Sequence, residues 1–571
     1  MDRRVFLAVI LTAVVIVVTP LLFPGTRQVP PGDSARAISS LRGDTTRVKG
    51  ADSNSGAESR KEKPVASSEQ RRPAARELPV SSMSDSVAAM SPHMTVWYAD
   101  ATASPLRVVL RDYGSRDTAR AKGPVLLESG PDQPLMSFEV QSGDSTIAIP
   151  GAQLSGSVRT SDGRQIVQYE GKLEGHDATI SYTSPASDSG KYLVHVTVDV
   201  KDVAPQSRLL VSLPSTLVSM ETDTADDIRH LAYGFRTASG SVESIPFAKL
   251  DSGTTRTASG PLEWVALRNK YFLVALVTGD SGILNAQFTG GARIEKMAPF
   301  AHGTVSLPLR AGRAEFELYL GPQEFERLRT LGHGLDQVNP YAGWFHSIVQ
   351  PFATIVTRVL LWMKRSSGLS YGWVIIIFGV VVRLLLWPLN QSAMRTSIRM
   401  QRIQPELAEV QKKYKSDPKK QQEALVKLYQ SHGMTPFSPM MGCLPMMLPM
   451  PILFALYFVF LNTIEFRGVS FLWMHDISAA DPYYITPLVM GLSMFALSWI
   501  GMRGTPPTPQ TRMMSYMMPV VLTFMFFRFA AGLNLYYAVQ NIAAIPQQWL
   551  LARERAGVAR SGRQVAPRKN E

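Results

Sequence analysis

Residues 371–390 read YGWVIIIFGVVVRLLLWPLN, an apolar run interrupted by one cation, Arg383. About 20 mostly apolar residues make a helix long enough to cross a bilayer. An arginine near the middle of such a helix costs roughly 2.5–3.5 kcal/mol on insertion scales, and a buried carboxylate usually offsets that cost. No other apolar stretch carries a central acid, and Glu465 lies only at the end of its stretch. We therefore expect Arg383 to line a wet cavity inside the membrane.

The overall charge is compatible with two kinds of partner. The 571 residues carry a formal net charge of +13, which suits nucleic acid or anionic phospholipid. Several segments are so apolar that only lipid accommodates them, so we expect a membrane protein with no DNA partner. The single cysteine, Cys443, excludes an internal disulfide.

The first 93 residues divide into an anchor and a linker. Residues 1–23 begin with Arg3 and Arg4 and run apolar from Val5. A cleaved signal peptide is the alternative, but the run exceeds the usual length of about 7–15 residues and lacks a small-x-small cleavage site. We expect a retained transmembrane anchor with its start in the cytoplasm. Residues 24–93 contain no aromatic side chain, which predicts a disordered linker.

Period-two patterning then takes over. Residues 192–200 and 315–320 alternate apolar and polar side chains, as strands with one buried face do. We expect an antiparallel β-sandwich domain over residues 94–335, with a short helix from 323 to 331 near its end. Four histidines in it lack metal-ligand spacing, and we expect no metal site: His176, His195, His230 and His302.

Six helical segments are expected to span the membrane. Residues 341–366 have one apolar face and predict an interfacial amphipathic helix, with a membrane span as the alternative. The spans after the anchor are residues 371–391, 440–463, 484–502, 513–529 and 533–551. The predicted fold class is therefore a multi-pass α-helical membrane protein, with five helices in a core over 371–551, plus an all-β domain.

Basic residues orient these spans. The loop from 395 to 432 holds nine Lys or Arg, whereas the loop from 464 to 483 holds only Arg467. The positive-inside rule places the long loop, both termini and the basic tail over 552–571 in the cytoplasm, and the β domain outside. Within residues 395–433 we expect a helical hairpin: Pro405 suits a first helical turn, Asp417-Pro418 a turn, and Gly433 a helix end. A solvated charged loop is the alternative.

Five motifs lie between residues 381 and 548. They are VVRLLLWPL (381–389), MQRIQPEL (400–407), GCLPMMLPMPILFALY (442–457), FLWMHDISAADPYYITPLVMG (471–491) and GLNLYYAVQNIAAIPQQ (532–548). With them, the stretch from about 341 to 551 resembles the core of the YidC membrane-protein insertase family, relatives of the mitochondrial oxidase-assembly insertases. The anchor and the large β domain resemble the Gram-negative type, in which that domain is periplasmic.

The resemblance implies an insertase and folding chaperone of the cell inner membrane, without catalytic residues or cofactors. It would insert apolar segments of nascent proteins through a hydrophilic groove, alone or with the general secretion translocon. The predicted groove residues are Arg383, Tyr537, Tyr536, Met450 and Gly379. Family members often have a polar residue at the position of Gly379, and the family glutamine before the third span's Met-Pro is replaced by a proline.

Methionines are concentrated near the expected groove. Fifteen of the 25 methionines lie between Met434 and Met525, and flexible thioethers suit promiscuous apolar contacts. We expect an apolar surface along which client helices slide, although each methionine could equally face lipid or fill a helix contact. Its predicted members are Leu453, Met446, Met447, Met517 and Met518.

Other functions remain open at this point. The partners expected are nascent membrane proteins, the ribosome, the translocon and anionic phospholipid. A transporter could use Arg383 as an anion site, but the spans show no paired repeat. The β domain could instead bind a sugar or peptide, with the spans as an anchor; deletion of residues 94–320 would separate these ideas. No GxxxxGK[ST] loop is present, and the pair His475-Asp476 lacks the further ligands of a metal hydrolase.

Overall fold

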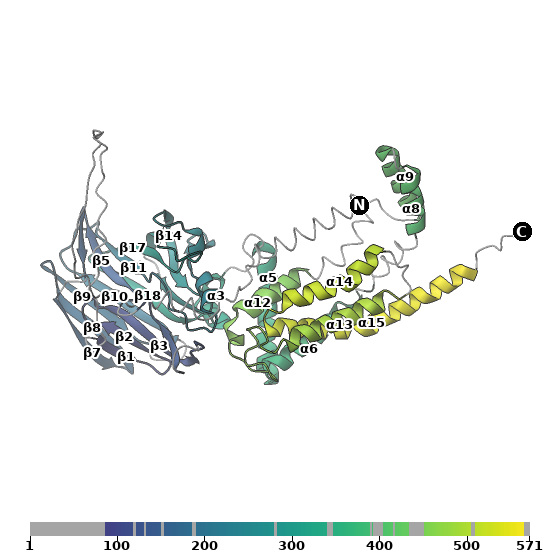
Figure 1. Cartoon of the computed structure of the whole chain (residues 1–571). Coiled ribbons are helices and arrows are strands. Elements are labelled where there is room, and N and C mark those ends of the chain that lie inside the picture. The colour runs from purple at the N-terminus through teal and green to yellow at the C-terminus, as the bar shows by residue number, and fades with distance from the viewer. Residues whose placement is uncertain are drawn as a thin grey trace, which may run out of the picture. The chain divides into compact units, whose positions relative to one another are not determined.

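The computed structural model describes residues 86–117, 122–130, 133–149, 153–185, 190–278, 282–339, 346–388, 391, 403–414, 417–432, 450–503 and 509–564. These form two compact units (Figure 1). The first runs to Pro322 and includes Leu328–Val338, and the second comprises Gln323–Arg327 and the chain from Asn339 onward. The predicted anchor and residues 24–85 of the predicted linker lie outside the described residues. The end of that linker is corrected, because Ser86–Met90 forms strand β1 paired with the strand over Met94–Ala99.

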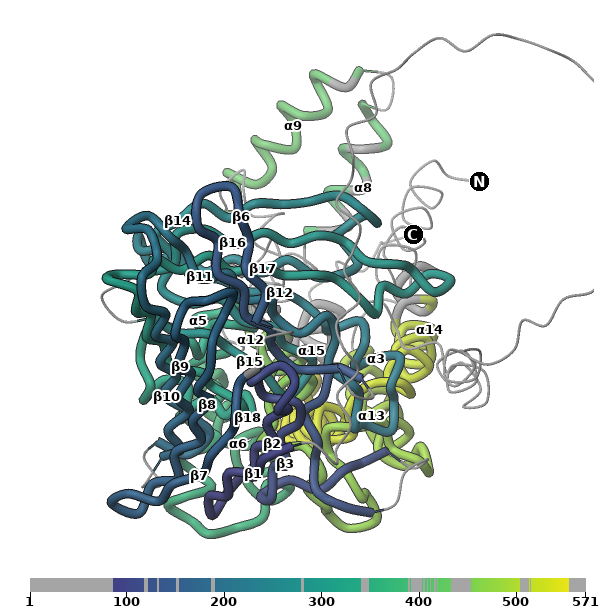
Figure 2. The backbone as a smooth tube through the Cα atoms, turned by 90° about the vertical axis from the view of Figure 1, so that its left-hand side faces the viewer, coloured from purple at the N-terminus to yellow at the C-terminus, as the bar shows by residue number. Residues whose placement is uncertain are grey.

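The first unit is a β structure in which all strand pairs are antiparallel. Four strands form one sheet: β1 (Ser86–Met90), β2 (Met94–Ala99), β3 (Ser104–Gly114) and β4 (Pro124–Leu127). The larger sheet follows the order β6-β5-β11-β17-β16-β14-β15-β18-β10-β9-β8-β7, and β12 pairs with β13 and β14. The run from β7 to β10 can be followed in Figure 2.

The bounds of these strands are β5 (Ser137–Ser142), β6 (Ser145–Ala148), β7 (Gln153–Ser161), β8 (Arg164–Leu173), β9 (His176–Thr183), β10 (Leu193–Val200), β11 (Arg208–Leu213), β12 (Ala232–Thr237), β13 (Val242–Pro246), β14 (Thr255–Arg268), β15 (Phe272–Val277), β16 (Ile283–Gly290), β17 (Ala301–Pro308) and β18 (Arg313–Pro322). Two short helices accompany them, α3 (Thr224–Arg229) and α4 (Phe325–Leu331). Helix α4 begins two residues after the start that the sequence predicts.

The alternation seen in the sequence becomes burial on one face. Val194, Val196, Val198 and Val200 of β10 are buried, while His195 and Asp199 on the other face remain partly exposed; Thr197 on that face is buried as well. In the same unit Tyr233 stacks on Phe288 and donates its hydroxyl to the carbonyl oxygens of Pro214 and Ala301. Burial of alternate side chains supplies the driving force for folding. The β-sandwich architecture predicted for this part of the chain is confirmed.

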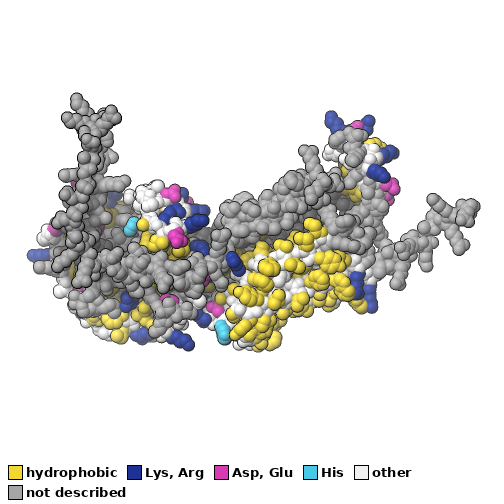
Figure 3. Space-filling model, viewed as in Figure 1, with side chains coloured by type: hydrophobic (Ala, Val, Ile, Leu, Met, Phe, Trp, Pro, Cys, Tyr) yellow, Lys and Arg dark blue, Asp and Glu magenta, His cyan; other side chains and the backbone are white. Residues whose placement is uncertain are grey.

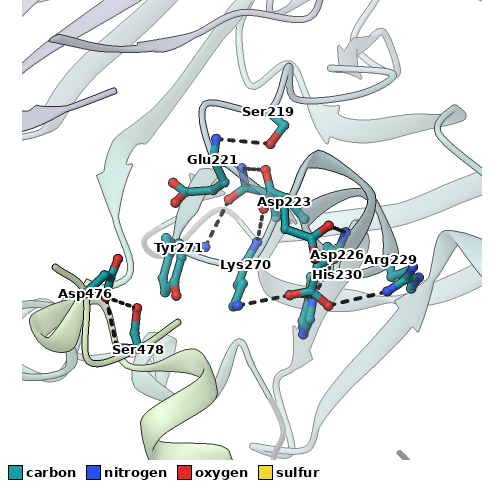
Figure 4. A network of polar contacts seen from close by, with 12 residues as sticks. Ser219, Glu221, Asp223, Asp226, Arg229, His230, Lys270, Tyr271, Asp476 and Ser478 are labelled. Carbon is teal, nitrogen blue, oxygen red and sulfur yellow. Dashed lines mark hydrogen bonds and ion pairs between the residues drawn. The ribbon is translucent and has the colours of Figure 1, made fainter. Parts of the chain in front are cut away.

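A polar network fastens α3 to the turn between β14 and β15 (Figure 4). Lys270 Nζ lies 2.9 Å from Asp226 Oδ2, and the Lys270 amide donates to Asp227. Asn269 Nδ2 donates to the other oxygen of Asp227 at 3.1 Å. Burial raises the pKa of Asp227 and outweighs these hydrogen bonds. Because its groups are mutually satisfied, the network is a structural anchor of α3.

The second unit is helical. Its helices are α5 (His346–Ser367), α6 (Tyr371–Leu385), α8 (Gln404–Lys413), α9 (Pro418–Ser431), α12 (Met450–Asn462), α13 (Ile485–Gly501), α14 (Pro509–Phe526) and α15 (Ala531–Gln564). Helix α5 packs on α12, α6 on α15, and α13 on both α14 and α15. Their shared core includes Ala353, Ile375, Leu456 and Leu533. Helices α8 and α9 form the predicted hairpin, and Asp417 caps α9 by accepting from the Lys420 amide at 3.2 Å.

Helices α6 and α15 end furthest from where the sequence predicts. Helix α6 stops at Leu385, and Leu386 forms a turn before the chain is helical again at Trp387 and Pro388. Arg383 therefore lies in the last turn of α6, not in the middle of a continuous span. Helix α15 continues to Gln564, into the segment assigned to the basic tail, because that segment is rich in helix-forming Ala and Arg.

Among the described residues, no helix taken singly has both the length and the apolar character needed to cross a membrane. One pair passes that test together, Val349–Ser367 with Tyr371–Leu385, and it is bent by 119° at its break. The count of six spans and the interfacial placement of residues 341–366 therefore stay predictions.

The outer surface of the helical unit is strongly apolar (Figure 3). Along α13 the exposed side chains recur every three or four residues: Leu488, Leu492, Phe495 and Trp499. Along α14 the exposed series includes Met517, Val520 and Phe524. Leu492 is 69 % exposed and Phe524 is 70 % exposed. Contiguous exposed apolar surface of this kind marks a membrane or partner interface.

Candidate functional site

The site begins with one stripe of α6. Gly379 and Arg383 are four residues apart and share one face of α6, and Trp387, four residues further on, lies just beyond the end of that helix. The free carbonyl groups of a helix end carry partial negative charge. This position favours a cation, which offsets part of the cost of placing Arg383 in apolar surroundings.

Helix α15 supplies the facing stripe. Gln540 Nε2 donates to the carbonyl oxygen of Gly379 at 2.8 Å and to the Tyr536 hydroxyl at 3.0 Å. A Cβ added to Gly379 would lie 3.0 Å from Cγ1 of Val539. The absence of a side chain at Gly379 thus lets the two helices approach closely enough for these hydrogen bonds.

The Arg383 guanidinium meets an amide. Its Nη2 donates to Gln547 Oε1 at 2.8 Å, and Gln547 Nε2 donates to the Trp387 carbonyl oxygen at 3.2 Å. Arg383 is half-buried, and its Nε is buried without a hydrogen-bond partner in the described part of the chain. No carboxylate of the described residues forms an ion pair with it. The positive charge is therefore hydrogen-bonded but not neutralised by those residues.

The two predicted tyrosines lie differently. Tyr536 is 5 % exposed, and its ring centroid is 6.0 Å from that of Phe378 on α6, beside the Arg383 stripe. The ring of Tyr537 packs edge-on against Phe526 of α14 at 5.4 Å. Its hydroxyl is buried with no hydrogen-bond partner among the residues that the structure describes. The structure thus groups Gly379, Arg383 and Tyr536, while Tyr537 lies toward α14.

The predicted apolar slide is only partly described. Met517 is 54 % exposed on α14, and Met518 beside it is half-buried. Met450 and Leu453 belong to α12, but their side chains lie outside what the structure describes, as do Met446 and Met447 altogether. Their part in a slide stays a prediction.

Sequence reasoning missed Gln540 and Gln547. They are seven residues apart, two helical turns, inside a stretch treated as a membrane span. Polar side chains in such a span usually face a partner helix or a cavity. That spacing was a usable signal, but the identity of their partners on α6 depends on contacts across about 160 residues of sequence.

The loop before α13 is held by one carboxylate. Asp481 accepts hydrogen bonds from Trp473 Nε1, from the backbone amide of Tyr483, and from both the amide and the hydroxyl of Thr486. The neighbouring Asp476 accepts from Ser478. In the described portions of the chain, no group of three or more His, Cys, Asp or Glu side chains is placed to hold a metal ion.

Two known protein families match this chain, one mainly over the helical unit and one mainly over the β unit. Residues 362–557 match the family described as 60Kd inner membrane protein, and residues 152–355 match the YidC periplasmic domain. The apolar helical unit and the β unit thus define an inner-membrane protein with a periplasmic domain. The chain belongs to the YidC family.

Individual relatives agree with that assignment. The chain is 32 % identical over 333 residues to the membrane protein insertase YidC of Polynucleobacter asymbioticus, covering 56 % of each chain. It is 32 % identical over 346 residues to the YidC of Chlorobium limicola, covering 57 % of this chain and 58 % of the relative. These alignments span a little over half the length of the curated relatives. A crystal structure of an active YidC insertase with its first transmembrane domain resolved matches with a TM-score of 0.31 and 20 % identity, over 81 % of this chain and 92 % of that one.

Proposed function

We propose that the protein is an insertase and folding chaperone for inner-membrane proteins. It transfers apolar segments of nascent chains into the bilayer through a hydrophilic groove that contains Arg383, alone or with the general secretion translocon. One observation carries this proposal: the Arg383 guanidinium, on an apolar helix, contacts the neutral amide of Gln547 and no carboxylate of the described residues. A cation left in that state is available to an incoming polar chain.

The barrier to insertion lies in the polar tail of the client. Its apolar helix prefers lipid, whereas the tail must cross to the far side. A groove open to cytoplasm and lipid shortens the dehydrated path, and Arg383 attracts acidic or hydrogen-bonding groups into it. For an acidic tail the membrane potential assists by about 2.3 kcal/mol per charge per 100 mV. No nucleotide is needed for this step.

The rest of the chain supports the same activity. The apolar surface of α13 and α14, with Met517 exposed on it, accommodates client helices of varied sequence. Six spans with both termini in the cytoplasm place the hairpin of α8 and α9 where nascent chains emerge. There its lysines contact ribosomal RNA or anionic phospholipid.

The test replaces Arg383 in cells depleted of their own insertase. Arg383→Ala should stall insertion of a client with an acidic tail, whereas Arg383→Lys retains the charge and should keep much of the activity. Arg503→Ala is the matched control, because Arg503 lies just beyond the end of α13 and its guanidinium stacks on the Trp499 ring at 4.1 Å. Protease accessibility of the tail reports insertion. Equal insertion by wild type and Arg383→Ala would count decisively against the proposal.

A further inference from the structure

The side chain of Gln547 connects α15 to the C-terminal end of α6. It is buried on α15, with 3 % of its surface exposed. Its Oε1 accepts from Arg383 Nη2 at 2.8 Å, and its Nε2 donates to the carbonyl oxygen of Trp387 at 3.2 Å. One side chain therefore holds both the guanidinium and the chain just beyond the last turn of α6.

The second hydrogen bond fixes the direction of the first. A glutamine amide has one acceptor end and one donor end. Because the donor end is committed to the Trp387 carbonyl, the acceptor end must face Arg383. The Trp387 carbonyl thus gains a donor from α15 and Arg383 gains an acceptor from the same side chain.

The acceptor is neutral, and this distinguishes it from an ordinary ion-pair partner. A guanidinium has five N–H donors, and the contact with Gln547 occupies one of them. A carboxylate at the same position would form a charge-assisted pair and cancel the positive charge. The amide orients the group and leaves its charge to act on whatever enters the site.

We propose that Gln547 is a positioning residue that holds the Arg383 guanidinium in place without neutralising it, and so makes the site selective for carboxylate-bearing segments of client polypeptides. This inference rests on the proposed insertase function and deepens it. The clients are the acidic translocated tails of the proposed function, and the new element is the role of Gln547: a carboxylate forms two parallel hydrogen bonds with the planar fork of a guanidinium only when that guanidinium is correctly oriented.

The experiment uses the full chain in insertase-depleted cells. Two clients are compared that differ only in their tails, one with Asp and Glu and the other with Asn and Gln at the same positions. Gln547→Glu places a carboxylate on the guanidinium with almost no change in size. Gln548→Glu, one residue further along α15, is the matched control because its side-chain amide lies beside Gly501 of α13.

We expect Gln547→Glu to reduce insertion of the acidic-tail client by about tenfold relative to the neutral-tail client, the scale of one hydrogen bond to a charged group. The control Gln548→Glu should leave that ratio unchanged. Gln547→Met removes the hydrogen-bond acceptor but leaves the charge of Arg383 unpaired, so it should lower the ratio less than Gln547→Glu does. The exchange Arg383→Gln with Gln547→Arg moves the charge to α15 and should restore preference for the acidic tail.

Each remaining outcome overturns the inference. Equal loss with both clients after Gln547→Glu would mean that Gln547 only supports helix packing, and an unchanged ratio would mean that it does not act on Arg383. Either result is distinguishable from failure of the proposed function. That failure would appear as no insertion by wild type, or as no effect of Arg383→Ala on the same two clients. Should Gln547→Glu not accumulate, the double exchange and Gln547→Met decide the matter.

Discussion

The ring of Phe471 lies directly against the α-carbon of Gly372: a Cβ added there would lie 2.1 Å from the ring Cγ. Gly372 is in the first turn of α6, and Phe471 belongs to the loop before α13. Trp373 meets the same ring edge-on at 5.7 Å. The start of the arginine-bearing helix is thus fixed by an aromatic side chain that leaves no room for a methyl group.

Gly372→Ala is expected to lower the free energy of unfolding by about 1–3 kcal/mol, the usual cost of overpacking a close contact. Thermal unfolding of the detergent-solubilised protein measures the decrease. Because the clashing atoms are Cγ, Cδ1 and Cδ2 of Phe471, Phe471→Ala in the same chain removes all three. The two losses of stability should then sum to more than the loss of the double variant, a non-additivity expected of residues in contact. Gly114→Ala is the control, since a Cβ at Gly114 would meet nothing within 4 Å. Equal effects at both glycines would contradict the prediction.

Asp481→Ala is expected to destabilise the loop before α13 by about 3 kcal/mol, because it leaves buried donors of Trp473 and Thr486 without an acceptor. Burial raises the pKa of Asp481, but the hydrogen bonds from Thr486, Trp473 and Tyr483 outweigh it and hold the pKa below its ordinary value.

The sign of the pH effect follows from that lowered pKa. Stabilisation by Asp481 is complete above the unfolded-state value of about 3.9 and is lost as the pH falls through the lower folded-state value. Unfolding curves of wild type and Asp481→Asn should therefore converge in acid. The control Asp144→Asn, in the exposed turn between β5 and β6, should unfold like the wild type at every pH. A constant gap between wild type and Asp481→Asn down to pH about 2 would refute the assignment.

Glu465 should behave in the opposite way. It follows α12, its Oε1 accepts from the Phe325 amide at 3.2 Å, and its Oε2 is buried without a partner among the described residues. Burial, helped by the nearby charges of Glu324 and Glu326, raises its pKa from 4.5 to about 7 against the opposing backbone hydrogen bonds.

A raised pKa favours the protonated form in the folded state. The stabilisation of the fold by protonated Glu465 is therefore full below pH 4.5 and is lost as the pH rises through about 7. At pH about 8, Glu465→Gln should be more stable than wild type by as much as about 3 kcal/mol, and at pH about 4 the two should be alike. Glu315→Gln, on an exposed strand position, is the control. Wild type that is equally stable at both pH values would contradict this prediction.

Local sequence patterns were enough to predict several elements of the fold. Alternation over residues 192–200 and 315–320 was enough to predict β10 and β18, because one face of each strand is buried. The hairpin was predictable from Pro405 and Asp417-Pro418, since both prolines lie at helix starts. These elements follow from signals that lie within a few residues of the structure they specify.

Long-range contacts were beyond the same reasoning. The sequence identified Arg383 as unusual but placed it in mid-helix, because hydropathy continues through Leu386 although α6 ends at Leu385. Its contact with Gln547 joins positions 164 apart, which no local period encodes. Tyr536 packs toward α6 and Tyr537 toward α14, and this difference likewise depends on where those two helices pack. The candidate residues were therefore predictable and their partners were not.

The hairpin offers a prediction that separates electrostatic docking from simple solvation. Among its described residues the exposed lysines are Lys412, Lys413, Lys419, Lys420 and Lys427. If they bind ribosomal RNA, ribosome binding should weaken steeply between about 50 and about 200 mM salt as counterions are released. Replacing Lys419 and Lys420 by Ala should reduce the salt slope by about one for each phosphate that is no longer neutralised, as co-sedimentation at several salt concentrations would measure.

The matched control removes the same charge elsewhere. Lys172→Ala with Lys201→Ala takes two exposed lysines from the β unit, which the proposed topology places across the membrane from the ribosome. Its salt slope should equal that of wild type. Counterion release depends on which lysines bind phosphate and not on the total charge of the protein. Equal salt slopes for the two double variants, or ribosome binding that does not change with salt, would contradict the prediction. The hairpin lysines would then serve only to orient the membrane spans.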